Sequence, residues 1–268
     1  MTALPQPAEI SDLKAARRPL DEIRALVRND LPRLPAHEPP AALRDLAGLW
    51  RWLADAQHKS RPSISRPRLA IFLSRHGAFP GQQETLPLLL SELEKGNHAS
   101  AALARAANAD LQVYELDLAR PSRDFRAGTA LNEDEAAQAV AYGMMTMQPG
   151  VDLLLVSAPN PVADLASTEI RRALKAGMDP FDALMRFGGF DIAAMAGAIV
   201  AARLARVPVV LEGAAAEAAA DILAALQEDA AAHTRKSSAL LWERTELPAP
   251  CRGALLIPFL KSLALVST

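Results

Sequence analysis

The segment of residues 188–213, GGFDIAAMAGAIVAARLARVPVVLEG, constrains the fold more than any other part of the chain. Gly188 and Gly189 supply the backbone freedom that a tight turn requires. Larger apolar residues then recur at helical spacing among alanines, which predicts a helix that packs closely on nearly all sides. Val207–Leu211 is short, β-branched and apolar on both faces, which is typical of a strand inside a parallel sheet. Glu212 follows this strand at its carboxyl end.

Strands and helices alternate along the rest of the chain. Further strands are predicted at 68–73, 111–118 and 152–156, and helices at 20–27, 41–57, 86–94, 99–107, 131–147, 163–176 and 217–232. This alternation predicts an α/β fold, with a mainly parallel sheet flanked by helices in three Rossmann-like layers. We expect residues 67–232 to form this core domain, and residues 1–66 with 233–268 to form a small, mainly helical domain or lid. The apolar segment 253–266 fits either a helix or a strand.

Composition excludes several classes of function. The formal net charge of −2 argues against a dedicated nucleic-acid-binding protein, which needs a concentration of Lys and Arg. No apolar run reaches the roughly 20 residues of a membrane span, and the first residues lack a signal-peptide pattern. Cys251 is the single cysteine, so we expect no intrachain disulfide and a cytoplasmic location. His98 and His233 stand without neighbouring ligands, so no metal site is expected.

Ligands of open α/β sheets bind at the carboxyl ends of the strands, so the residues that follow the predicted strands are candidate ligand contacts. They are Ser74, Arg75, His76 and Gly77 after the first strand, Ser157 and Asn160 after the third, and Glu212 after the strand of the 188–213 segment. Gly188, Gly189 and Asp191 join them at the start of the central helix, where a negative charge suits the helix dipole. Gln83, in the loop after the first strand, has the groups to bind the edge of a heteroaromatic ring.

Each candidate also has an ordinary structural interpretation. His76 fits a residue that caps a turn, and Arg75, Gln83 and Glu212 fit solvated surface positions. Position at a strand end favours a ligand contact without deciding it.

The 188–213 segment resembles the nicotinate-nucleotide–dimethylbenzimidazole phosphoribosyltransferases, in which a GGFEIAA-type helix leads to a VPVVLDG-type strand. Other stretches resemble the same family in the same order along the chain. Glu38-Pro39-Pro40 matches its KPPGSLG opening, Arg68–Gly77 its strand that ends in a DHG turn, and Gly96–Leu118 its GGAAINVLAR helix and following strand.

The resemblance implies an activity. Members of the family move ribose 5-phosphate from nicotinate mononucleotide to dimethylbenzimidazole, and the product, α-ribazole phosphate, supplies the lower ligand of cobalamin. A glutamate in a C-terminal GEGTGA-type motif accepts the proton of the benzimidazole N–H. The family implies a nucleotide and a benzimidazole-like base as ligands, no cofactor, no metal and a homodimer.

The sequence departs from the family at the positions that carry this chemistry. Pro248–Ala254 stands in place of GEGTGA, and Glu246 is the only carboxylate nearby, which makes it a weak candidate for the base. Val156–Pro161 replaces a GEMGIGNTT-type loop, and its two prolines cannot donate N–H groups to a phosphate. Arg75 replaces the aspartate of the DHG turn, and Glu38 replaces the lysine of KPPGSLG.

Two hypotheses follow from these departures. The chain is either a working phosphoribosyltransferase with a rearranged site, or a non-catalytic relative that binds a similar ligand or a partner enzyme. The catalytic glutamate and the phosphate loop are predicted to be lost in both cases.

Overall fold

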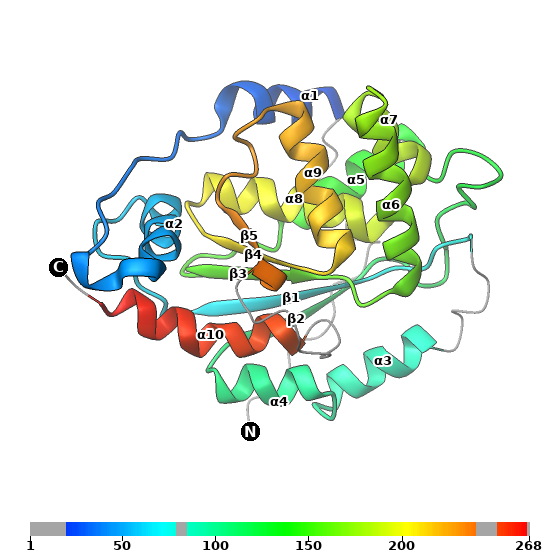
Figure 1. Cartoon of the computed structure of the whole chain (residues 1–268). Coiled ribbons are helices and arrows are strands. Elements are labelled where there is room, and N and C mark those ends of the chain that lie inside the picture. Colours follow the sequence, from blue (N-terminus) through cyan, green and yellow to red (C-terminus); the bar gives the residue numbers. More distant parts are fainter. Residues whose placement is uncertain (1–19, 79–84, 240–250, 267–268) are drawn as a thin grey trace.

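The computed structural model describes residues 20–78, 85–239 and 251–266. Strands from these residues form one parallel sheet in the order β2-β1-β3-β4-β5 (Figure 1). The strands are β1 (Pro67–Leu73), β2 (Asp110–Glu115), β3 (Leu153–Ser157), β4 (Val209–Glu212) and β5 (Thr234–Lys236). The helices are α1 (Leu20–Ala25), α2 (Ala47–Gln57), α3 (Thr85–Glu94), α4 (Ala99–Ala106), α5 (Glu133–Met144), α6 (Pro161–Lys175), α7 (Pro180–Phe187), α8 (Phe190–Leu204), α9 (Ala214–Leu226) and α10 (Cys251–Ala264). The predicted α/β fold with a parallel sheet is confirmed.

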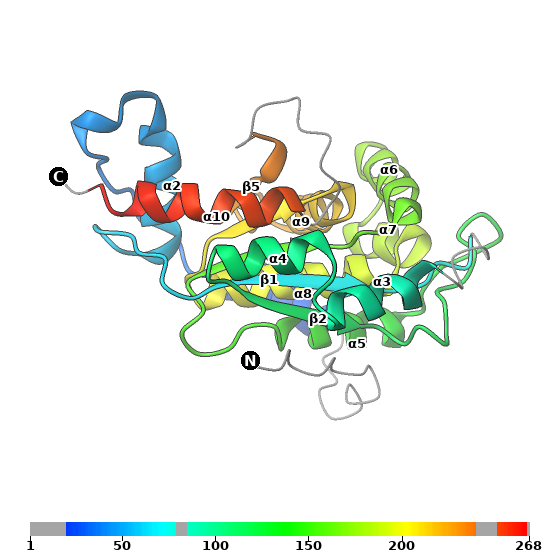
Figure 2. The same ribbon diagram turned by 90° about the horizontal axis from the view of Figure 1, so that it is seen from below.

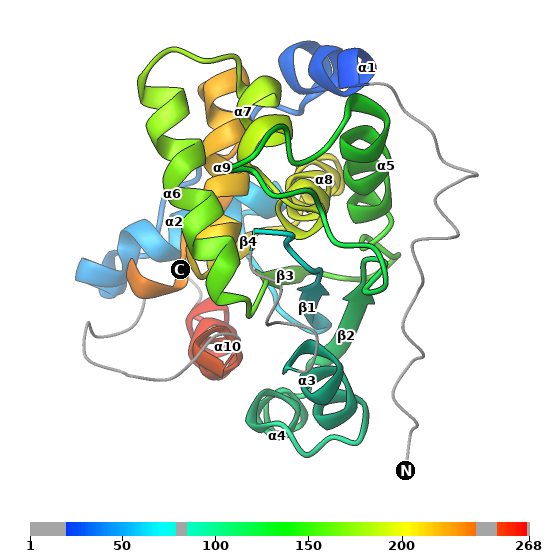
Figure 3. The same ribbon diagram turned by 90° about the vertical axis from the view of Figure 1, so that its right-hand side faces the viewer.

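Helices cover both faces of the sheet, which gives the predicted three layers. Helices α5, α8 and α9 lie on one face and α3, α4 and α10 on the other (Figures 2 and 3). Residues of β1 alternate between the two faces, as the pleat of a strand requires. Leu69 and Ile71 pack in the cluster with α10, whereas Ala70 and Phe72 pack in the cluster with α8. The protein therefore has a hydrophobic core on each side of one sheet.

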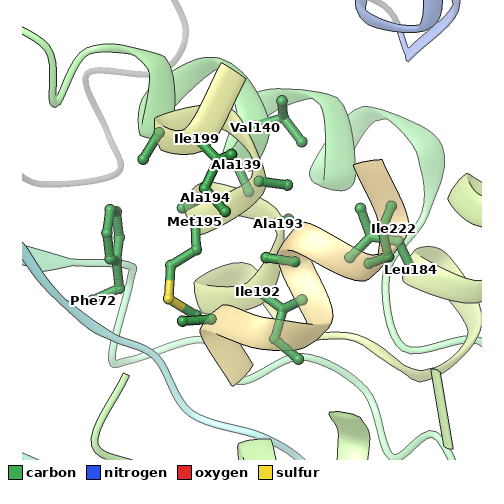
Figure 4. Packing of buried hydrophobic residues seen from close by; sticks show 14 of the residues in the cluster. Phe72, Ala139, Val140, Leu184, Ile192, Ala193, Ala194, Met195, Ile199 and Ile222 are labelled. Carbon is green, nitrogen blue, oxygen red and sulfur yellow. The ribbon is translucent and has the colours of Figure 1, made fainter. Parts of the chain in front are cut away.

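Helix α8 is the central element of the larger core. Every residue from Phe190 to Arg203 is buried, which confirms the prediction of a helix packed on nearly all sides. Figure 4 shows Ala194 and Ile199 of α8 beside Ala139 and Val140 of α5. Small side chains at this contact let the two helices approach closely.

Some elements differ from the sequence predictions. The segment 253–266 is a helix, α10, although Pro258 lies inside it and removes one backbone donor. Helix α7 and strand β5 were not predicted, and α9 begins at Ala214 rather than at residue 217. The predicted helix at 41–57 begins with a 3₁₀ segment, Ala41–Leu46, and α2 follows it. Strand β5 is three residues long and contains Arg235 and Lys236, so it lacks an apolar pattern.

Segments from the two ends of the chain pack on this sheet. Helix α1 contacts α5, α2 contacts α10, and α10 contacts β1 and β4. The division into a 67–232 domain and a smaller unit stays a prediction. Within the described ranges, no helix is long and apolar enough to cross a membrane.

Helix α5 begins with a capping box, which gives a testable stability contribution. The Asn132 side chain accepts the Glu135 N–H at 2.8 Å, and the Glu135 carboxylate accepts the Asn132 N–H at 2.8 Å. Replacing Asn132 with alanine is expected to lower the free energy of unfolding by about 1 kcal/mol in urea denaturation. Asn132→Asp, which restores a carboxylate acceptor, should stay near the wild type. If both variants lose the same unfolding free energy, the acceptor oxygen of residue 132 does not stabilise the helix.

Candidate functional site

The order of the strands makes the edge between β1 and β3 the candidate position for a ligand. In a doubly wound sheet of this order, the connections from β1 and β3 leave on opposite faces and open a crevice at their carboxyl ends. Ser157, at the end of β3, pairs in register with Ile71 of β1 and with Glu212 of β4. The Asn160 amide donates to the Ser74 carbonyl at 3.0 Å and joins the two loops. The ends of three strands therefore meet at one edge.

Ser157 and Glu212 lie on the α10 side of the sheet. Both are buried, and each continues the strand face that carries Leu155 or Val210 into the α10 cluster. A Cβ at Gly253 would stand 2.5 Å from Oε2 of Glu212, so the carboxylate lies directly against the first turn of α10. A larger residue at this position would push the carboxylate away from its present place.

The carboxyl group of Glu212 is buried without a hydrogen-bond partner. The residue is 1% exposed, and neither carboxylate oxygen has a partner among the described residues. Burial raises its pKa from 4.5 to about 7, although the Gly253 and Arg252 N–H groups and the Arg252 charge pull the pKa down. These N–H groups lie close enough to affect the pKa but outside hydrogen-bond geometry. The group therefore exchanges a proton near neutral pH.

The Ser157 hydroxyl is also buried without a partner among the described residues. Ser157 and Glu212 are register neighbours, so a hydroxyl and a carboxylate that both lack a partner within the described ranges share one face of the sheet edge. Buried polar groups are normally hydrogen-bonded. Two such groups side by side are typical of a surface that a polar ligand completes.

His76 and Asp191 form a buried pair on the α8 side of the same edge. Nε2 of His76 lies 3.1 Å from each carboxylate oxygen of Asp191, and the two residues are 2% and 0% exposed. A Cβ at Gly189 would overlap the imidazole ring, so the glycine turn before α8 makes this pair possible. His76 Nδ1 has no partner in the described part of the chain. A neutral ring that donates Nε2–H to Asp191 presents Nδ1 as an acceptor.

The other predicted residues lie around this edge. Arg75 donates to the Leu118 carbonyl at 2.8 Å, and the Gly77 N–H donates to the Ser122 carbonyl at 2.8 Å. Gly188 closes α7, where its N–H donates to the Leu184 carbonyl at 2.8 Å. Their role in ligand binding stays a prediction. Gln83 and Glu246 lie outside the described residues.

The first turn of α10 is the part of the site that sequence reasoning missed. Cys251 and Gly253 lie at the Glu212 carboxylate, and burial with this negative charge raises the pKa of the Cys251 thiol. A glycine near the start of an apolar segment was the only signal. Among the residues that the structure describes, no group of three or more His, Cys, Asp or Glu has the arrangement of a metal site.

Comparison with known proteins places this chain in a family. A family model described as Phosphoribosyltransferase matches residues 19–158 and 165–239. The nicotinate-nucleotide–dimethylbenzimidazole phosphoribosyltransferase of Cereibacter sphaeroides (strain ATCC 17025) is 33% identical over 238 residues, which cover 73% of this chain and 70% of that protein. The protein of the same name from Ruegeria pomeroyi is 34% identical over 237 residues, covering 74% and 70%.

A solved structure shares the fold. The crystal structure of CobT from Thermus thermophilus has a TM-score of 0.71 at 20% sequence identity, and the match covers 91% of this chain and 95% of that one. The break in the family match, at residues 159–164, covers the end of the loop after β3 and the first residues of α6. The chain belongs to the phosphoribosyltransferase family that includes the nicotinate-nucleotide–dimethylbenzimidazole enzymes.

Proposed function

We propose that the protein transfers a phosphoribosyl group from nicotinate mononucleotide to a benzimidazole-type base, the reaction for which its relatives are named. One observation carries the proposal beyond family membership. The carboxyl group of Glu212, at the carboxyl edge of the sheet, is buried without a hydrogen-bond partner among the described residues and has a pKa of about 7. Such a group is suited to accept a proton in neutral solution.

The reaction needs a proton acceptor. One ring nitrogen of the base attacks C1′ of the ribose, the bond between C1′ and the nicotinate nitrogen breaks, and nicotinate leaves with that electron pair. The new bond puts a positive charge on the base, which is lost when its N–H proton departs. Glu212 in its ionised form accepts this proton. In this proposal Glu212, at the end of β4, takes the role that the family assigns to a glutamate in its C-terminal motif.

The neighbouring groups suit the binding of a nucleotide. The Ser157 hydroxyl beside Glu212 has no partner in the described part of the chain and can donate a hydrogen bond to a ligand oxygen or accept one from a ligand hydroxyl. His76 Nδ1 offers a further polar contact. Asp191 holds the His76 ring in place. We assign Glu212 the catalytic role, and Ser157 and His76 binding roles.

A non-catalytic relative is the second candidate, and the loop after β3 favours it. Ser157-Ala158-Pro159-Asn160-Pro161 has two residues without an N–H group. The Asn160 side chain caps α6 by accepting the Val162 N–H at 3.0 Å and donates to Ser74. Both ends of this amide are therefore engaged within the fold. The predicted loss of the C-terminal glutamate concerns residues 240–250, outside the described residues.

Incubating the pure protein with nicotinate mononucleotide and 5,6-dimethylbenzimidazole tests the two candidates. Release of nicotinate with formation of the ribazole phosphate, followed by liquid chromatography and mass spectrometry, is the expected result. A reaction without the base separates transfer from hydrolysis of the mononucleotide. Calorimetric binding of both compounds without turnover would favour the non-catalytic relative, and absence of binding would reject both.

We further propose a homodimer that acts in the cytoplasm. The implied homodimer comes from the resemblance to the family, and the single, buried Cys251 suits a reducing compartment. Light scattering that gives the mass of one 28.6 kDa chain would reject the dimer.

A further inference from the structure

A cavity of about 380 Å³ lies between the loop after β2 and helices α6 and α7. Phe125 of the loop and Phe187 of α7 line it as an edge-to-face pair, with ring centroids 6.4 Å apart. Leu165 of α6 adds a third apolar side chain and is 49% exposed. Two aromatic rings and an exposed leucine form an apolar wall that is large enough for a single ring.

Arg186 puts a positive charge into this apolar cavity. Its Nη1 donates to the carbonyl oxygens of Phe125 and Gly128, which anchors the loop. Nε and Nη2 have no hydrogen-bond partner among the described residues, and no carboxylate of those residues lies within ion-pair distance. A half-buried guanidinium normally faces an anion. Here two or more N–H donors stay available beside the aromatic pair.

The nearby charged groups do not neutralise Arg186. Glu169 lines the cavity but forms its ion pair with Arg172, one turn along α6, at 3.1 Å. Arg126, also in the lining, pairs with Asp124 at 2.8 Å. The Thr168 hydroxyl donates to the Asp164 carbonyl at 3.0 Å, and its oxygen can still accept. The cavity thus has a guanidinium that stacks over the Phe187 ring, with Cζ 4.9 Å from the ring centroid, and that no carboxylate of the described residues neutralises.

We propose that this cavity binds a small aromatic carboxylate, with the ring against Phe125, Phe187 and Leu165 and the carboxylate on Arg186. A planar carboxylate matches the planar guanidinium, which gives the bond both charge and direction. The site goes beyond the proposed transfer reaction and does not depend on it. Phe187 lies two residues before Gly189, which packs against the His76 ring.

Benzoate and its uncharged analogue benzamide test the proposal by titration calorimetry. The wild type should bind benzoate more tightly than benzamide. Arg186→Gln should weaken benzoate binding by roughly tenfold or more and leave benzamide little changed, so that the preference disappears. A merely structural role of Arg186 would weaken both ligands alike. Arg171→Gln removes an arginine of α6 that is not in the cavity and that pairs with Glu217 and Asp221 of α9, and it should bind benzoate as the wild type does.

A second variant covers the case in which Arg186→Gln disturbs the loop. Leu165→Trp fills the cavity from a half-exposed position on α6 and should abolish benzoate binding while thermal unfolding stays near the wild type. Displacement of benzoate by nicotinate mononucleotide would place the nicotinate part of the donor in this cavity. Simultaneous binding of both would make it a separate carboxylate site. Lack of benzoate binding, or binding that neither variant changes, would overturn the proposal whether or not the protein transfers phosphoribosyl groups.

Discussion

Replacing Glu212 with glutamine is expected to lower kcat for phosphoribosyl transfer by about 10²–10⁴-fold, the usual contribution of a positioned acid or base. Glutamine has nearly the shape of glutamate but cannot accept the proton that the benzimidazole ring loses. The wild-type rate should rise with pH through the pKa of about 7 and then level off. The variant should lose this rise. Initial rates between pH 5.5 and 8.5 check both points.

The same substitution is expected to stabilise the protein at alkaline pH. The pKa of Glu212 is higher in the folded protein, about 7, than its ordinary value of 4.5, so the folded state binds more protons between these pH values. The free energy of unfolding therefore falls as pH rises from 4.5 to 7 and stays lower above. Glutamine removes this loss, which is on the order of 3 kcal/mol at pH 8. Urea denaturation at pH 4.5 and 8 should show the variant ahead only at pH 8.

Glu217→Gln is the matched control for Glu212. Glu217 lies on α9, partly exposed, in ion pairs with Arg171 and Lys236 at 3.3 and 2.8 Å. Its replacement should leave kcat within about twofold and should not stabilise the protein at pH 8, since an ion pair is lost. Full activity of Glu212→Gln would reject the assigned base. A variant that is less stable than the wild type at pH 8 would show that the carboxylate has partners in solution that this structure lacks.

Alanine at Gly197 or Gly143 is expected to cost about 3 kcal/mol or more of unfolding free energy, the upper end of overpacking in a core. The two glycines lie where α8 and α5 cross. A Cβ on Gly197 would stand 2.8 Å from the Val140 carbonyl carbon, and a Cβ on Gly143 would stand 2.8 Å from Cα of Ala194. The obstacles are backbone atoms of a buried helix, so no side chain can turn aside. The helices must separate.

Gly48→Ala supplies the control for this prediction. Gly48 lies in α2, and no atom stands within 4 Å of the position that a Cβ would take, so alanine there should raise stability by roughly 0.5–1 kcal/mol. Urea denaturation of the three variants beside the wild type gives the comparison. The double variant Gly143→Ala, Gly197→Ala should not fold, because its cost approaches the whole stability of a typical domain. Losses under about 1 kcal/mol in the single variants would mean that the helices lie farther apart than described.

The sequence predicted the strands and helices that have a clear local pattern of apolar residues. Alternation of apolar runs with helical periodicity identified β1, β3, β4 and α8, and α5 lies within the helix predicted at 131–147. Strand β5 is short and carries Arg235 and Lys236, so its place in the sheet comes from the hydrogen bonds of β4 rather than from its own residues. The order of the strands likewise depends on contacts across the sheet.

The site was predictable only in part, for the same reason. Strand-end position identified His76, Ser157 and Glu212 one by one, and position at the start of the central helix identified Asp191. The pairing of His76 with Asp191 joins residues 115 positions apart, and no local pattern predicts it. The high pKa of Glu212 arises from burial under α10, a helix whose assignment the sequence left open. Neither a pKa nor an unpaired oxygen can be predicted until the covering element is placed.

The burial of α8 on every side also limits how its sequence can change. Each side chain from Phe190 to Arg203 meets packed atoms, so few substitutions are tolerated at any of these positions. Loops at the sheet edge carry no such restriction and diverge more freely. The 188–213 segment, which makes this chain recognisable as a relative, is therefore constrained by packing in the core. Two proteins that share it share an architecture, and in the function proposed here Glu212 and its neighbours decide whether they share a reaction.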